Sequence, residues 1–165
     1  MAIELKDSKE DPSLSKIDWF DNTCYECFSN FYEAPIVYNE KEYVTNEHFF
    51  QAHKATTPED FEKIRTAPTP GTAKRYGNQI KLISNWEDKK DRIMFTALLL
   101  KFTQHPQLAF ALLRTQNRYI EEGNNWGDKY WGVVDGKGEN TLGKLLMKVR
   151  EILSQDLGEL HESED

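Results

Sequence analysis

The stretch that most constrains the fold is residues 93–100, which would be apolar on every side of a helix. A helix of this kind must be covered by the rest of the chain, so the pattern predicts a central buried helix. Ser84 with Glu87 three residues on forms a capping box for its start, and we expect its end near Gln104, before Pro106. A chain of 165 residues can bury enough surface to need no disulfide or metal for stability.

Further start and stop signals predict several helices around this one. Threonines that precede helical patterns, two of them followed by proline, are typical of helix N-termini. The expected helices run from Thr45 or Asn46 to about Ala55, from Thr57, from Thr69 to a stop at Gly77, from Pro106 through Leu113, and from Asn140 or Thr141 to near Leu153. Short strands are expected at 25–31 and 36–43, with a turn at 39–41. The predicted fold class is therefore mostly α with a small β element (α+β).

Length and composition indicate one domain over 1–165, with an ordered core of about 17–155 and flexible termini. No segment is long and apolar enough to span a bilayer, and no apolar signal core follows Met1, so we expect a cytoplasmic protein. The net charge of −7 disfavours wide binding to duplex DNA but leaves a local basic site open. Cys24 and Cys27 form a single CxxC pair, which is a poor zinc site, so no metal is expected.

Glu47, Gln51 and Lys54 fall on one stripe of the helix that follows Thr45. One interpretation is a solvated stripe of paired charges. The other places Glu47 in a pocket at the N-terminal end of the helix, where the helix dipole favours an ionised carboxylate. An ionised carboxylate is what a positively charged, sugar-like transition state requires.

Residues 121–140 show no helical period and contain five glycines among aromatic and acidic residues. Trp131 and its aromatic neighbours could stack on a base, and Asp128 could bind a ribose hydroxyl or donate a proton. A structural loop anchored by tryptophan is the alternative. Gly132 would allow a ligand to approach the backbone closely, and the amides that begin the helix after Asn140 could hold a phosphate.

Two residues near the predicted central helix have two interpretations each. Trp86 lies in its first turn, where a single tryptophan is more often core than ligand. Lys101 follows the apolar stretch and either extends to solvent or reaches a buried acid or phosphate.

Six short motifs occur in an order that resembles the NADAR family, and within it the YbiA-like riboflavin-intermediate N-glycosidases. They are CFSNF (27–31), NEHFFQAHK (46–54), NWE (85–87), LKF (100–102), DKYWG (128–132) and GENTLGKLL (138–146). The resemblance covers about residues 25–153. After Gly132 the chain departs from the glycine-rich YbiA-like pattern, since Val133 and Val134 follow instead. These two β-branched residues would stiffen the loop and alter the rim of the site.

The resemblance implies a YbiA-like, mostly helical domain that cleaves an N-glycosidic bond to ribose. In that branch the substrates are phosphorylated ribosylamino-pyrimidines, and the products are a free base and ribose 5-phosphate. The family's functional acids fall on Glu47 and Asp128, and its two pocket tryptophans fall on Trp86 and Trp131. The expected chemistry needs no metal or redox cofactor.

On this hypothesis Glu47 stabilises an oxocarbenium-like ribosyl centre or orients the attacking water. Asp128 binds ribose hydroxyls or protonates the departing nitrogen, while Trp86 and Trp131 sandwich the base. Further candidates for substrate contacts are Ser29, Asn30, Phe31, Gln51, Lys54, Lys101, Gly132 and Asn140. Two other functions stay open: removal of ADP-ribose from guanine in nucleic acid, and non-catalytic binding of ADP-ribose or NAD. The oligomeric state stays open too.

Overall fold

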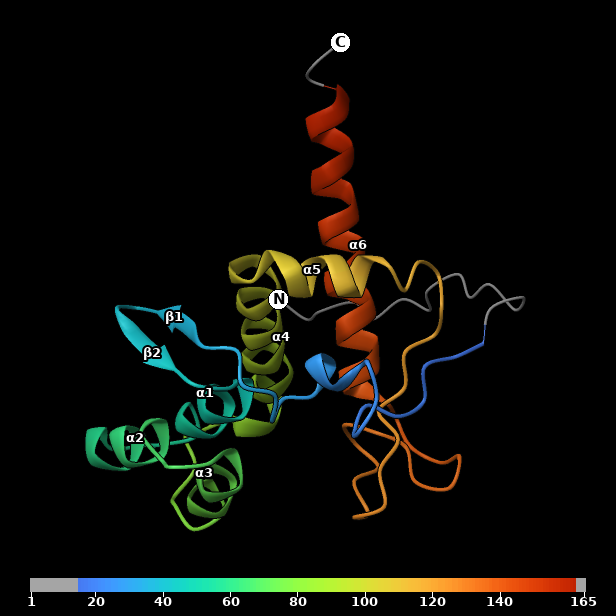
Figure 1. The fold of residues 1–165 in the computed structure, drawn as a ribbon. Coiled ribbons are helices and arrows are strands. Elements are labelled where there is room, and N and C mark those ends of the chain that lie inside the picture. Colours follow the sequence, from blue (N-terminus) through green and yellow to red (C-terminus); the bar gives the residue numbers. More distant parts are fainter. Residues whose placement is uncertain (1–14, 163–165) are drawn as a thin grey trace. The chain divides into compact units, whose positions relative to one another are not determined.

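The computed structural model describes residues 15–162, with side chains described through residue 156 (Figure 1). The expectations of flexible termini fall mostly outside these residues. The chain forms two compact units. We call residues 29–104 the 29–104 unit, and the described residues 15–28 and 105–162 the two-segment unit. The single domain expected from the length stays a prediction.

The 29–104 unit begins with an antiparallel hairpin, as expected. Strands β1 (Ile36–Tyr38) and β2 (Lys41–Tyr43) pair Ile36 with Tyr43 and Tyr38 with Lys41. Asn39 and Glu40 between them have φ values of 49° and 61°. Left-handed backbone at both central positions is the turn geometry that matches the twist of a two-residue hairpin.

Four helices complete this unit: α1 (Asn46–Ala52), α2 (Pro58–Arg65), α3 (Pro70–Gly77) and α4 (Trp86–Gln104). The expected threonine caps are confirmed, because Thr45, Thr57 and Thr69 each accept a hydrogen bond from the backbone N–H three residues on. No residue between 93 and 102 is exposed, so α4 is the expected buried helix. The core contains Ile36, Tyr43, Phe49, Ala52, Ile64, Ala73 and Ala97.

Two helix boundaries in the 29–104 unit differ from the expectation. Helix α1 ends at Ala52 rather than near Ala55, because the chain leaves the helix to pair with residues 82–83: the Lys54 carbonyl accepts from the Ile83 N–H (2.9 Å). Helix α4 begins at Trp86, directly after Asn85 with a φ of 57°, and not at a Ser84 cap. Helix α3 ends at Gly77, as expected, and Gly77 also allows close packing, since an added Cβ would lie 2.0 Å from Gln51 Oε1.

The two-segment unit contains the 3-10 helix η1 (Glu26–Phe28) and helices α5 (Pro106–Leu113) and α6 (Thr141–Glu162). Leu142, Leu145, Leu146 and Val149 form a buried stripe on α6, and α5 packs against this helix. Residue 17 pairs with residue 120 as a parallel bridge.

Two expectations for this unit are wrong. The predicted strand at 25–31 contains η1 instead, because Phe28 N donates to the Tyr25 carbonyl (2.9 Å) and Tyr25 N donates to Thr23 Oγ1 (3.1 Å). These short-range bonds use the backbone groups that a strand would offer to a neighbour. Helix α6 continues to Glu162, well beyond the expected end near Leu153. Among the described helices, none is long and apolar enough to cross a membrane.

Replacing Gly143 tests the packing at the start of α6. A Cβ at this position would lie 2.2 Å from the Ile120 carbonyl oxygen, which belongs to the backbone and cannot rotate away. Gly143→Ala should therefore lower the free energy of unfolding by about 1–3 kcal/mol in urea titrations. Gly71→Ala is the matched control, because its nearest neighbour would be 3.9 Å away. Equal stabilities of the two variants would contradict this account.

Candidate active site

Glu47 lies in the first turn of α1 and is only 6% exposed. Its Oε1 accepts a hydrogen bond from Gln51 Nε2 (2.7 Å), and its backbone N–H donates to the Asn30 carbonyl (3.0 Å). Gln51 is buried as well, so the interpretation of a solvated stripe is wrong for both residues. A buried carboxylate held at both its backbone and its side chain keeps one orientation, which is what an electrostatic catalyst needs.

Lys54 lies against two aromatic rings of the same unit. Its Nζ is 5.3 Å from the centre of the Phe50 ring and 5.4 Å from that of Trp86, and the two rings are themselves 5.1 Å apart. Trp86 is 8% exposed, so much of it is core, as its sequence position alone suggested. Burial lowers the pKa of Lys54, while the nearby Glu47 carboxylate acts in the opposite direction. A carboxylate thus lies in the first turn of α1, and an ammonium lies just after the end of this helix.

The segment 29–31 runs beside the start of α1 and contains three of the predicted contacts. Ser29 Oγ accepts from the Phe31 N–H (3.2 Å), and the Phe31 ring is 44% exposed, with Lys74 Nζ 5.9 Å from its centre. Asn30 is buried and donates through Nδ2 to the sulfur of Met94 (3.3 Å). The segment therefore both supports Glu47 through Asn30 and presents an open aromatic surface.

Lys101 is fully buried, so the expectation that it extends to solvent is wrong. Its Nζ donates to the Ser29 carbonyl (2.9 Å) and lies 5.4 Å from the centre of the Tyr32 ring. This ammonium thus fixes the 29–31 segment. In the same segment, the Asn30 carbonyl accepts the hydrogen bond from the Glu47 backbone N–H. A contact between Lys101 and substrate stays a prediction.

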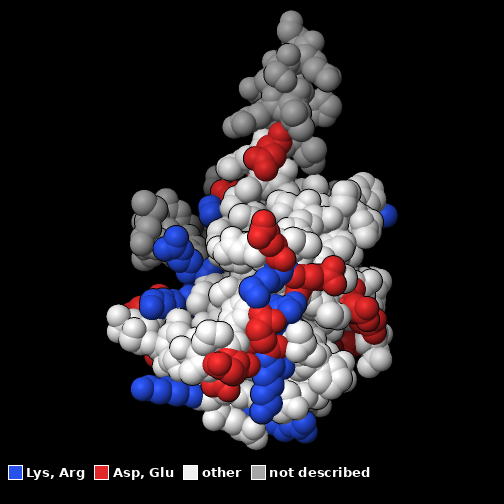
Figure 2. Space-filling view, turned by 90° about the vertical axis from the view of Figure 1, so that its left-hand side faces the viewer, with Lys and Arg blue, Asp and Glu red and all other residues white. Residues whose placement is uncertain are grey.

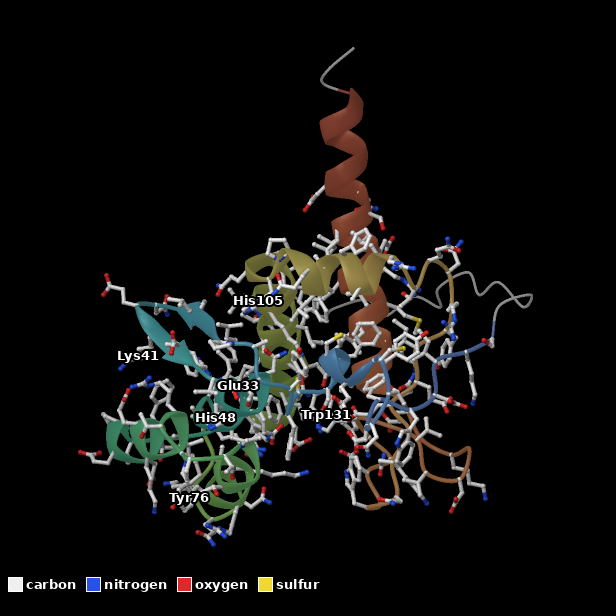
Figure 3. All side chains as sticks on the ribbon, viewed as in Figure 1. Glu33, Lys41, His48, Tyr76, His105 and Trp131 are labelled. Atoms are coloured by element: carbon white, nitrogen blue, oxygen red, sulfur yellow. The ribbon has the colours of Figure 1, made fainter. Side chains whose placement is uncertain are left out.

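His48 connects α1 with the backbone of residue 67. Its Nε2 lies 3.0 Å from the Ala67 carbonyl and its Nδ1 lies 2.8 Å from Thr45 Oγ1. A carbonyl can only accept, so we assign the proton to Nε2 and let the threonine hydroxyl donate to Nδ1. Burial lowers the pKa of His48, which agrees with a neutral ring. Figure 3 labels this side chain on α1 and Tyr76 on α3.

Sequence reasoning missed two polar residues in this unit. Asn46, expected only as a helix cap, is buried, and its Nδ2 donates to Asn30 Oδ1 (3.4 Å). Lys74 stands in the last turn of α3, where a basic residue is ordinary. Lys74 is three residues before Gly77 and so shares its face, but nothing in the sequence connects that face with α1.

In the two-segment unit, Asp128 organises its own loop. Its Oδ1 accepts from the backbone N–H groups of Tyr130 (3.1 Å) and Trp131 (2.9 Å). Asn124 bonds to the backbone of the same residue, with Oδ1 accepting from the Asp128 N–H (3.0 Å) and Nδ2 donating to its carbonyl (2.7 Å). The structural interpretation of this loop is therefore correct in part, and a chemical role for Asp128 stays a prediction.

The amides at the start of α6 are already used. Thr141 N donates to the Tyr130 carbonyl (3.1 Å) and Leu142 N donates to the Trp131 carbonyl (3.0 Å). The expectation that these amides hold a phosphate is therefore wrong for both. The same bonds fix the backbone of Trp131, whose ring meets the Tyr130 ring edge to face at 5.0 Å. The two loop carbonyls thus occupy the position in which these amides would bind an anion.

Gly132 and Asn140 have clear packing roles in the same unit. A Cβ at Gly132 would lie 2.2 Å from the Glu122 carbonyl oxygen, so its close neighbour is backbone. The Asn140 amide donates to Tyr119 Oη (3.0 Å) and to the Ile120 carbonyl (2.9 Å), and its Oδ1 accepts from Glu122 N (3.0 Å). Substrate contacts by these two residues stay predictions.

The predicted site residues thus fall into two sets. The 29–104 unit contains Ser29, Asn30, Phe31, Glu47, Gln51, Lys54, Trp86 and Lys101, and the two-segment unit contains Asp128, Trp131, Gly132 and Asn140. Within the first set, hydrogen bonds and ring contacts connect Glu47 with Gln51 and Asn30, and Lys54 with Trp86. A sandwich of the base between Trp86 and Trp131, the residue labelled in Figure 3, stays a prediction.

Charge and possible metal ligands complete the description. On the face drawn in Figure 2, the coloured basic and acidic side chains are interspersed. Ion pairs of the 29–104 unit include that of Lys41 with Glu62 (2.6 Å). Among the side chains that the structure describes, residues 15–156, no group of three or more His, Cys, Asp or Glu could hold a metal ion. Cys24 is exposed, Cys27 is buried, and neither forms a disulfide.

A family model for the NADAR domain matches residues 19–154, and the chain therefore belongs to the NADAR family. It is similar to N-glycosidase YbiA of Shigella sonnei, with 43% identity over 133 residues that cover 79% of this chain and 82% of the relative. The NMR structure of the E. coli protein YbiA superposes with a TM-score of 0.78 and 39% identity, covering 86% of this chain and 87% of the other. The expected YbiA-like α+β fold is thereby confirmed.

A third relative is a longer protein. Riboflavin biosynthesis protein VVA0006 of Vibrio vulnificus is 32% identical over 130 residues, which cover 77% of this chain and 35% of that protein.

His48 in α1 and the half-buried His53 at its C-cap predict a loss of stability in mild acid. Burial lowers the pKa of both His48 and His53 below 6.5, so the unfolded state takes up more protons as the pH falls. The free energy of unfolding should have its highest value above about pH 6.5. At lower pH it should decrease by at most about 1.4 kcal/mol per pH unit for each histidine. Urea titrations between pH 7.5 and 5 measure this slope. An equal slope in the His48→Gln/His53→Gln double variant would refute it.

Variants of Asp128 separate its structural role from a chemical one. Asp128→Ala removes the acceptor of two backbone N–H groups and should lower the free energy of unfolding by about 1–2 kcal/mol. Asp128→Asn keeps an accepting oxygen and should stay close to wild type in the same urea titration. A chemical role would leave Asp128→Asn stable but poorly active. An alanine variant as stable as wild type would contradict the described loop.

Proposed function

We propose that this protein is an N-glycosidase that hydrolyses the bond between ribose and the base of phosphorylated ribosylamino-pyrimidine intermediates of riboflavin synthesis. The activity is that of the N-glycosidase relatives, with which the chain shares family and fold. The name of the Vibrio vulnificus relative supports riboflavin synthesis as the source of the substrate. These names favour hydrolysis of such intermediates over removal of ADP-ribose from nucleic acid and over a non-catalytic binding module.

The observation that carries the proposal is the buried, oriented carboxylate of Glu47. When the bond to the base weakens, positive charge develops on the ribosyl carbon and ring oxygen. A carboxylate fixed by Gln51 and excluded from bulk water stabilises such a charge without reorganising. Glu47 thereby lowers the barrier at the step where the glycosidic bond breaks.

The remaining steps use water and a proton donor. Water adds its hydroxyl to the ribosyl carbon, and the departing base nitrogen takes up a proton, which yields the free base and the free sugar phosphate. We assign the proton donor or the sugar-hydroxyl ligand to Asp128, whose Oδ1 is turned toward its own loop. Trp86 and Trp131 are proposed to stack on the base, where each contact stabilises binding by roughly 1–3 kcal/mol.

Glu47→Gln tests the electrostatic role. The amide keeps the shape, and its oxygen can still accept from Gln51, but the negative charge is gone. We expect kcat/KM to fall by about 10²–10³-fold while the thermal midpoint stays near that of wild type. Mass spectrometry of released base and ribose 5-phosphate measures the activity. Glu59→Gln, an exposed position in the first turn of α2, is the matched control.

Two outcomes would overturn parts of this proposal. Near-full turnover by Glu47→Gln would remove Glu47 from the mechanism. An ADP-ribosylated guanine oligonucleotide serves as the competing substrate. Release of ADP-ribose from it, with no reaction of the ribosylamino-pyrimidine phosphate, would show that the proposed substrate is wrong.

A further inference from the structure

Two lysines of the 29–104 unit place their ammonium groups over aromatic rings near Glu47. Lys54 Nζ lies over the rings of Phe50 and Trp86, at 5.3 and 5.4 Å from their centres. Lys74 Nζ, from α3, lies 5.9 Å from the centre of the Phe31 ring, and Phe31 is 44% exposed. An ammonium over an aromatic ring is held in place while part of its surface remains open to a ligand.

Two contacts bring these lysines to the same part of the unit. The hydrogen bond from Glu47 N to the Asn30 carbonyl places Phe31 beside the first turn of α1. At the other end of α1, the Gln51 side chain packs against Gly77 of α3. Lys74 is one turn before Gly77, so α3 carries it along the face that meets α1.

Charges of both signs act on Lys54. Burial is the main cause that lowers the pKa of Lys54, and Lys74 lowers it further, which means that the two ammonium groups repel each other. Glu47 and Glu87 act in the opposite direction. Glu87, however, is exposed and pairs with Lys90 (2.5 Å), so Glu47 is the buried counter-charge. A bound anion would relieve the repulsion between the two lysines.

We propose that Lys74, together with Lys54, binds the phosphate group of the ribosyl substrate. The aromatic rings hold the two ammonium groups, and a dianionic phosphate supplies the charge that both attract. Lys74 is then a specificity-determining residue: it distinguishes the phosphorylated substrate from its unphosphorylated form and takes no part in bond cleavage. The kinetic test of this inference rests on the proposed function, whereas the binding test does not.

The kinetic test compares a ribosylamino-pyrimidine with and without its 5′-phosphate. Lys74→Gln should raise KM for the phosphorylated form by about 10- to 100-fold, as expected for the loss of a charged hydrogen bond, and leave kcat within about 2-fold. The unphosphorylated form should react as with wild type, and Lys74→Arg should restore most of the affinity. Lys63→Gln is the matched control, because it removes the same charge from a lysine that lies over Tyr76 instead (4.5 Å).

Direct binding tests the same idea without turnover. By calorimetry, wild type and Lys63→Gln should bind ribose 5-phosphate at least about 10-fold more tightly than ribose, and Lys74→Gln should lose that difference. An unchanged KM for the phosphorylated substrate, or equal binding of ribose 5-phosphate by Lys74→Gln and wild type, would overturn the proposal. If wild type hydrolyses neither substrate but shows the binding difference, the proposed function fails and the phosphate site stands. A wild type that binds both sugars equally would overturn the site itself.

Discussion

The backbone hydrogen bond from Glu47 to the Asn30 carbonyl is the contact on which the 29–104 unit's chemistry depends. It joins the first turn of a seven-residue helix to an irregular segment that has no regular structure of its own. Isolated helices this short are not stable in water, so α1 exists because its surroundings hold it. Thr45 caps it, His48 bonds to residue 67, and all seven of its residues are buried. The carboxylate is rigid because the helix cannot move independently of its neighbours.

The polar and aromatic groups around this helix show how buried charged side chains are stabilised. A buried ammonium or carboxylate is unfavourable unless other groups compensate for its lost hydration. Lys101 has the Ser29 carbonyl and the Tyr32 ring, Lys54 has two aromatic rings and Glu47, and Glu47 has Gln51. Each charge therefore fixes a neighbour, and the contacts that stabilise the charges also fix the geometry of the candidate site.

In the two-segment unit, Asp128 has a clear structural role. Asp128 fixes the backbone of residues 130 and 131, and the carbonyls of those residues in turn accept from the first amides of α6. A loop with several glycines would otherwise lose much conformational entropy on ordering. Through Oδ1 alone, Asp128 gives Trp131 a defined backbone, whatever the acid also does for a substrate.

The sequence by itself determined the family and many of the local elements. Threonine caps, proline at helix starts, the asparagine turn and the uniformly apolar stretch of α4 act over a few residues, so their outcome can be predicted from the residues alone. The motifs in order were enough to identify the NADAR family and to single out Glu47.

Only tertiary structure decided the rest. It ended α1 early by pairing with residues 82–83, buried Lys101 under the Ser29 segment, and occupied the α6 amides with the 130–131 carbonyls. It also brought Lys74 near Lys54 across the packing of α3 on α1. Contacts of this kind join residues far apart in the sequence, and they depend on which surfaces pack together, which no local pattern specifies.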